Sequence, residues 1–119
     1  MKNTIIEYCL QKKGAVKDYP FGPDPLVIKI ENKMFALIFE DMGKHTLLNL
    51  KCDPVIADNL REQHGAVRPA YHMNKKHWNT VAIDGSLPES DVFAMIDHSY
   101  DLVVKNLPKS VRESLTEMS

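Results

Sequence analysis

Three short runs with high β-propensity, separated by short polar segments, most constrain what this chain can fold into. The runs are LVIKI at residues 26–30, MFALIF at 34–39 and TLLNL at 46–50. Short polar connections between such runs are typical of hairpins, so the sequence predicts a three-stranded antiparallel meander. The middle run is apolar on both faces, which indicates either a central strand covered on both sides or a face left for a partner.

Segments with helical periodicity flank this meander. The best-defined one begins near Glu89 and is stopped by Pro108, and Asp53-Pro54 is typical of a helix start. In the helix after Pro54, the spacing places Arg61 on the side that faces water. Two S/T-x-x-E patterns, at residues 4–7 and 86–89, predict capping boxes. We therefore expect four helices, near residues 5–13, 54–63, 89–107 and 110–115.

A fourth strand is predicted at residues 78–83, where side chains alternate between the two faces. Gly65, Pro69 and Asn74 interrupt any periodicity in residues 64–76, which we therefore interpret as a loop. The expected order is αβββαβαα, an α+β fold with an antiparallel sheet made of the meander plus one later strand. With 119 residues and no linker, the whole chain (1–119) is expected to form a single domain.

Charge is segregated along the chain, although the formal net charge is only −1. Residues 64–83 contain no acidic side chain and carry a formal charge of +3, whereas residues 84–102 contain five acidic side chains and no Lys or Arg. Two interpretations follow. The basic stretch binds an anionic partner, or it pairs internally with the acidic helix that follows, through surface ion pairs worth about 0–1 kcal/mol each.

The candidate binding site lies in this basic stretch. Lys and Arg side chains neutralise phosphates, and aromatic rings stack on bases or enter a groove, so the pattern predicts DNA binding. The alternatives are a protein-interaction or small-anion-binding module with no nucleic-acid role, and a solvated surface in which the Trp belongs to the core. The candidate nucleic-acid-binding residues are Arg68, Tyr71, His72, Asn74, Lys75, Lys76, His77 and Trp78.

Other site types are not expected. The stretch has three histidines, but it lacks a Cys or carboxylate to complete a metal site, so no metal or other cofactor is predicted. Nothing in the sequence places a histidine beside Cys9 or Cys52, so an enzyme is not predicted; a cleft joining either thiol to a histidine would change that view. The absence of an N-terminal apolar run predicts a cytoplasmic protein with no membrane span.

The segments YPFGPDPLVIKIENKMFALIF, LNLKCDP, VRPAYHMNKKHWNTVAIDGSLP and IDHSYDLVV resemble the MmcQ/YjbR family of small bacterial proteins. The resemblance extends from residue 4 to about residue 112, and NKKHW lies at the centre of its most specific part. It implies a compact α+β fold similar to frataxin/CyaY, described as a double wing, and a DNA-binding role assigned by fold analogy. Frataxin-like proteins use acidic surfaces for iron, and Asp97 with Asp101 are too few carboxylates for such a ridge.

Overall fold

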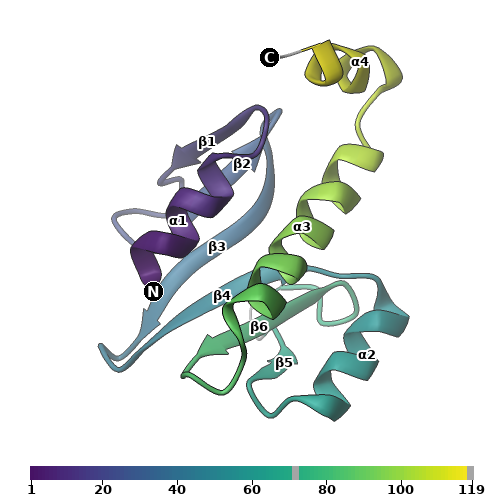
Figure 1. The fold of residues 1–119 in the computed structure, drawn as a ribbon. Coiled ribbons are helices and arrows are strands. Elements are labelled where there is room, and N and C mark those ends of the chain that lie inside the picture. The colour runs from purple at the N-terminus through teal and green to yellow at the C-terminus, as the bar shows by residue number, and fades with distance from the viewer. Residues whose placement is uncertain (71–72, 118–119) are drawn as a thin grey trace.

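The computed structural model describes residues 1–70 and 73–117, which form a six-stranded sheet with four helices (Figure 1). The α+β class predicted from the sequence is confirmed. In chain order the elements are α1 (Lys2–Leu10), β1 (Ala15–Asp18), β2 (Leu26–Ile30), β3 (Lys33–Asp41), β4 (His45–Lys51), α2 (Pro54–Gln63), β5 (Val67–Pro69), β6 (Trp78–Ile83), α3 (Glu89–Lys105) and α4 (Lys109–Glu117).

The sheet has the strand order β1-β2-β3-β4-β6-β5, and every neighbouring pair is antiparallel. The predicted meander is β2-β3-β4, and the predicted fourth strand, β6, pairs with β4. Two short edge strands, β1 and β5, were not predicted. The interpretation of residues 64–76 as loop throughout was therefore wrong, because β5 lies within them. An edge strand tolerates Pro69, since one side of its backbone needs no partner.

One face of the sheet forms the core against α1 and α3, which both lie over it (Figure 1). A buried row of side chains crosses five strands on this face, because the register places each member beside the next. The helices add Ile5 and Ile96 to this row, both fully buried. The row consists of Leu26, Ile38, Leu48, Val81 and Val67.

The opposite face of the sheet is covered by loops rather than helices. Here the register aligns Val27, Leu37, Asn49, Thr80 and Arg68 across the strands, so the face becomes polar toward β5. The Thr80 hydroxyl donates to Asn49 Oδ1 at 2.6 Å. The centre of β3 is buried on both faces, as expected for a covered central strand.

The N-cap of α2 agrees with the sequence, whereas the N-caps of α1 and α3 do not, although α3 begins at Glu89 as predicted. Asp53 Oδ1 accepts hydrogen bonds from the backbone N–H groups of Val55 and Ile56, at 3.0 and 3.4 Å. Neither predicted capping box forms, since Met1 and Pro88 are the N-caps of α1 and α3 and make no side-chain cap bond.

Ser86, one of the predicted capping residues, is engaged elsewhere. Its backbone N–H and its hydroxyl both donate to Asp84 Oδ1, at 3.0 and 2.6 Å. This local turn competes with a capping box for the serine side chain. Helix α3, which follows this turn, is nevertheless long and well formed.

Among residues 1–70 and 73–117, no helix has the length and apolar character needed to cross a membrane.

A buried serine ties α3 to the sheet. The Ser99 hydroxyl donates to the Phe35 carbonyl oxygen at 2.6 Å and accepts from the Lys51 backbone N–H at 2.9 Å. Ser99 is fully buried, so it satisfies two main-chain groups of β3 and β4 that would otherwise lose water without a replacement. It thereby fixes the end of β4, where the candidate site begins.

We expect Ser99→Ala to lower the free energy of unfolding by about 1–3 kcal/mol, because it leaves two buried main-chain groups unpaired. Ser114→Ala is the matched control: Ser114 is exposed and bonds only within α4, to the Ser110 carbonyl oxygen. Its effect should stay within about 0.5 kcal/mol. Urea unfolding monitored by circular dichroism measures both, and equal losses would contradict the role of Ser99.

Candidate nucleic-acid interface

The predicted binding stretch is the connection of a β-hairpin at one edge of the sheet. Pro69 of β5 pairs with Asn79 of β6, and the Ala70 N–H donates to the Trp78 carbonyl oxygen at 3.0 Å. The connection between β5 and β6 therefore lies at the end of the sheet where β6 begins, and its described part, Ala70 and residues 73–77, is called the hairpin loop below. Tyr71 and His72, two of the predicted site residues, lie outside the described residues.

Asn74 organises the turn that precedes β6. Its carbonyl oxygen accepts hydrogen bonds from the N–H groups of His77 and Trp78, at 3.0 and 2.9 Å. Its side-chain Oδ1 accepts from the Lys76 N–H at 3.0 Å. Asn74, one of the predicted nucleic-acid-binding residues, thus uses its side-chain oxygen to shape the loop, as Asn commonly does in turns.

Arg61 of α2 holds this loop from the inside. Its Nε donates to Asn79 Oδ1 at 2.7 Å, and its Nη2 donates to the carbonyl oxygens of Lys75 and, at 3.4 Å, Trp78. The prediction that the Arg61 side chain faces water was therefore wrong, since this side chain is only 19 % exposed. Periodicity gave the polar side of α2, but the hairpin packs against that side.

The predicted cations are placed where a polyanion can reach them. Arg68 on β5 and Lys75 and Lys76 in the turn are all exposed. His77 is half-buried, and its carbonyl oxygen accepts the Cys52 N–H at 2.7 Å, which joins the loop to the end of β4. The loop is therefore fixed at both ends by main-chain contacts while its cationic side chains face solvent.

Trp78 lies where the sheet ends, directly beside Lys51 in the β4–β6 register. It is half-buried and borders two surface hollows of about 390 and 340 Å³, both of which also include Lys51 and Asn106. Lys33 of β3 lines the smaller hollow. Lys33 and Lys51 were missed in the sequence, because only the non-local strand register brings them to Trp78.

The alternative interpretation was that the basic stretch pairs internally with the acidic helix, α3. Asp97 of α3 instead pairs with residues near the start of the chain. This carboxylate of α3 forms an ion pair with Lys12 and accepts a hydrogen bond from the Tyr8 hydroxyl at 2.7 Å. The ring of Tyr8 also stacks on Phe93, with centroids 3.9 Å apart. Asp97 therefore serves to pack α3 against the start of the chain and does not neutralise the hairpin loop.

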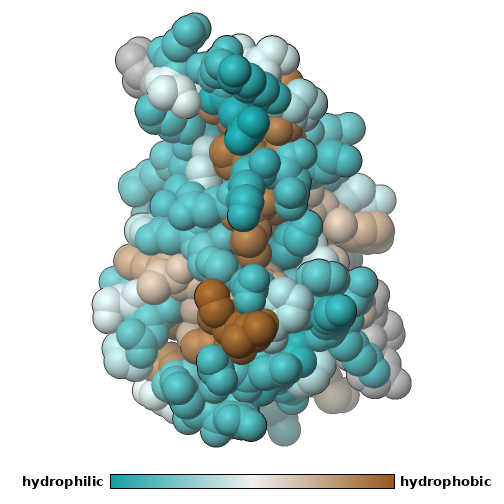
Figure 2. All heavy atoms as spheres, turned by 90° about the vertical axis from the view of Figure 1, so that its right-hand side faces the viewer, coloured by the Kyte–Doolittle hydropathy of each residue, from teal (hydrophilic) through white to brown (hydrophobic). Residues whose placement is uncertain are grey.

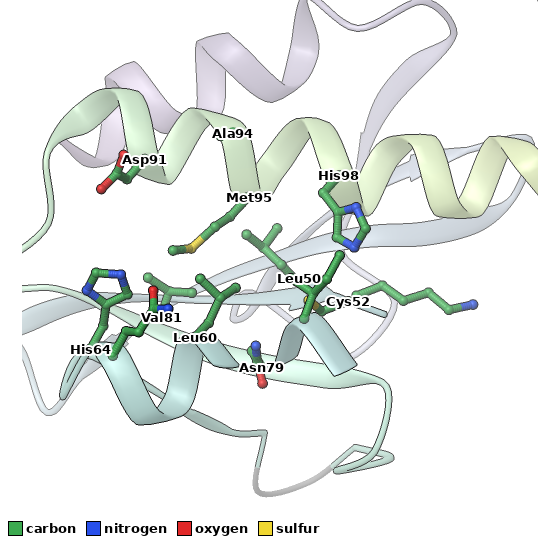
Figure 3. Close-up of a pocket in the computed structure, with 13 residues that line it drawn as sticks. Leu50, Cys52, Leu60, His64, Asn79, Val81, Asp91, Ala94, Met95 and His98 are labelled. Carbon is green, nitrogen blue, oxygen red and sulfur yellow. The ribbon is translucent and has the colours of Figure 1, made fainter. Parts of the chain in front are cut away.

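A separate cavity lies between α2 and α3, over β4 and β6, and a cysteine and two histidines line it (Figure 3). Burial, followed by the nearby charge of Asp53, raises the pKa of the Cys52 thiol to about 11. His98 Nε2 accepts the Asp53 backbone N–H at 3.1 Å. The thiol is thus protonated at neutral pH, and the histidine nitrogen that could act as a base is engaged.

Within residues 1–70 and 73–117, no group of three His, Cys, Asp or Glu side chains is placed to hold a metal ion. His64 borders the α2–α3 cavity, whereas His77 borders one of the hollows beside Trp78. These two histidines of the basic stretch therefore face different parts of the surface, which is not how a shared first shell is built.

Comparisons with known proteins agree with the family that the sequence resembles. A family model described as YjbR matches residues 10–102. The "Uncharacterized protein YjbR" of Escherichia coli strain K12 is 37% identical over 116 residues, covering 98% of each chain. The "Uncharacterized protein YyaQ" of Bacillus subtilis strain 168 is 29% identical over 114 residues, covering 85% of this chain and 96% of that one.

Solved structures share the whole fold. The crystal structure of Deinococcus radiodurans protein DR2400, with family-model domain DUF419, aligns with a TM-score of 0.88 and 32% identity, covering 96% of this chain and 86% of that one. A crystal structure of a Pseudomonas syringae protein aligns with a TM-score of 0.76 and 28% identity, covering 86% and 97%. The arrangement of helices on one side of an antiparallel sheet is therefore common to these proteins.

Removing the Arg61 side chain should loosen the hairpin loop. We expect Arg61→Ala to speed amide exchange at His77 and Trp78 by about tenfold or more and to lower the free energy of unfolding by about 1–3 kcal/mol. Arg112→Ala is the control, since Arg112 is exposed on α4. Hydrogen exchange followed by NMR measures the effect, and unchanged protection at both amides would contradict the bracing role.

The raised thiol pKa predicts slow alkylation of Cys52. A protonated thiol is a poor nucleophile, so iodoacetamide should label Cys52 slowly at pH 7–8 and faster as the pH approaches about 11. Mass spectrometry of a Cys9→Ser variant reports on Cys52 alone, and the same protein in denaturant gives the exposed rate. Rapid labelling of the folded protein at pH 7 would favour an activated thiol and hence an enzyme.

Proposed function

The chain belongs to the YjbR family, and we propose that it is a non-enzymatic module that binds DNA through the β5–β6 hairpin loop. The observation that carries the proposal is the position of Trp78: this ring lies beside Lys51 and directly after the turn that exposes Lys75 and Lys76. Nucleic-acid binding uses cationic side chains to neutralise phosphates and aromatic rings to stack on bases, and both kinds of group are adjacent here.

Preorganisation of the loop supports this role. Arg61 and Asn74 together bind the turn through its main chain, so the cationic side chains extend from a backbone that is already fixed. A loop fixed in this way loses less conformational entropy on binding than a free one. The lysines and Arg68 thus contact phosphates, and Trp78 with His77 approaches the bases.

The hollows beside Trp78 extend the surface beyond the hairpin. Lys33 and Lys51 come from the ends of two central strands and add cationic groups next to the indole ring. Asn106, at the end of α3, adds an amide that can donate to phosphate oxygens. In our proposal the DNA backbone therefore lies across the sheet end, between the hairpin loop and the end of α3.

Replacing two lysines of the turn with glutamates should weaken DNA binding. For Lys75→Glu/Lys76→Glu we expect a loss of about tenfold or more in low salt, and a shallower dependence of affinity on salt by about two counterions. Fluorescence of Trp78, the only Trp in the chain, reports binding to duplex and single-stranded oligonucleotides across a salt titration.

The matched control is Lys13→Glu/Lys17→Glu, which makes the same charge change at exposed positions near β1, at the opposite edge of the sheet. Its affinity should fall far less. Equal losses in both variants would point to bulk charge alone, and unchanged affinity of the Lys75/Lys76 variant would refute the proposal. Quenching of Trp78 by inorganic phosphate without DNA affinity would favour the small-anion alternative.

A further inference from the structure

The cavity between α2 and α3 is a separate feature from the hairpin loop. It has a volume of about 350 Å³, and its floor and walls are mainly the apolar side chains of Leu50, Leu60, Val81 and Met95 (Figure 3). Cavities that bind small molecules are of this size and are likewise mostly apolar, with a few fixed polar groups.

Apolar side chains continue from the cavity to the surface. Figure 2 shows an interrupted brown band crossing the otherwise hydrophilic face on the α2 side of the molecule. Ile56 both lines the cavity and is 43 % exposed, and the neighbouring Val55 is 70 % exposed. A ligand entering beside α2 would therefore meet apolar groups at the rim as well as inside.

Asn79 provides a fixed polar group in this apolar setting. It is only 2 % exposed, and its Oδ1 accepts the Arg61 Nε–H at 2.7 Å, which sets the orientation of the amide. The Nδ2 group is thereby directed into the cavity, where a ligand can reach it (Figure 3). A donor held in one orientation on the wall of an apolar cavity marks a place for an acceptor.

The cavity lining includes one lysine, Lys51, and one carboxylate, Asp91, while its cysteine and His98 carry no charge. Burial keeps the Cys52 thiol protonated by raising its pKa to about 11. His98 accepts a hydrogen bond at Nε2, which requires that nitrogen to be unprotonated. Asp91 is exposed and lies at the outer end of the cavity, near His64 (Figure 3). Lys51 alternates with Leu50 along β4 and also borders the hollows beside Trp78. A charged ligand among the apolar side chains would therefore lose its hydration without a counter-charge in contact, so a neutral molecule fits best.

We propose that the α2–α3 cavity is a binding site for a neutral, mainly apolar small molecule whose carbonyl oxygen accepts a hydrogen bond from Asn79 Nδ2. Leu50, Leu60, Val81 and Met95 enclose its apolar part. The site is distinct from the proposed DNA contact of the hairpin loop, because Lys75, Lys76 and Trp78 do not line this cavity.

Three probes of equal ring size separate the features of the site: benzamide carries a neutral carbonyl group, benzoate a charged one, and toluene none. In NMR titrations of the full chain, benzamide should bind saturably at millimolar concentration, as expected for a fragment of this size. The shifted signals should include the Met95 methyl and the Asn79 side-chain amide. Benzoate should bind at least about tenfold more weakly, since its charge is uncompensated.

Two variants test the same geometry. Asn79→Asp keeps an oxygen for Arg61 but replaces the donor with a carboxylate oxygen, so benzamide affinity should fall about tenfold or more while toluene affinity changes far less. Ala94→Phe places a ring at an exposed position that lines the cavity and should exclude benzamide and toluene alike.

The Lys75→Glu/Lys76→Glu protein is the control, and it should bind benzamide as the unmodified chain does. Failure of the DNA proposal therefore leaves this result unchanged. Absence of any saturable benzamide shift in the Met95 methyl, up to the solubility of the probe, would overturn the proposed site. Benzamide affinity that is unchanged by both Asn79→Asp and Ala94→Phe would overturn it equally.

Discussion

The guanidinium group of Arg61 is the interaction on which this end of the molecule depends. It extends from α2 to the side chain of Asn79 and to the carbonyl oxygens of Lys75 and Trp78. Helix α2 fully buries only Ala57, so apolar packing alone attaches it weakly. Because the planar guanidinium offers several donors in a fixed geometry, one side chain of a helix satisfies acceptors on a strand and on a loop.

Two surfaces follow from this single group. On one side, the backbone of the hairpin loop is held so that its lysines face solvent beside Trp78. On the other, the Asn79 amide is turned so that its nitrogen faces the α2–α3 cavity (Figure 3). A lysine at position 61 could not hold both, since its single ammonium group lacks the fork of donors. The basic loop and the neutral cavity thus share a support while differing in the chemistry they offer.

The central architecture was predictable from the sequence, whereas its edges and the pairing around the site were not. The apolar pattern within a single segment is enough to predict strands β2, β3, β4 and β6 and helix α3. Strands β1 and β5 are too short for any period and form because a neighbouring strand supplies their hydrogen bonds. The proximity of Lys51 to Trp78, and of Arg61 to the loop, depends on contacts between distant segments, which periodicity within one element does not encode.

Because Arg61 contacts both proposed sites, it also determines whether binding at one site would strengthen or weaken binding at the other. A ligand that accepts from Asn79 Nδ2 restrains the amide, and the restrained Oδ1 in turn holds the Arg61 guanidinium in place. The same guanidinium binds the turn that carries Lys75, so a ligand in the cavity would lower any remaining entropy cost of fixing the loop on DNA if both proposals hold. Coupling of binding free energies is reciprocal, so DNA on the loop would strengthen ligand binding in the cavity by the same factor. Such cooperativity would require no change in the shape of the sheet, because the common element is one side chain that bonds both Asn79 and the loop.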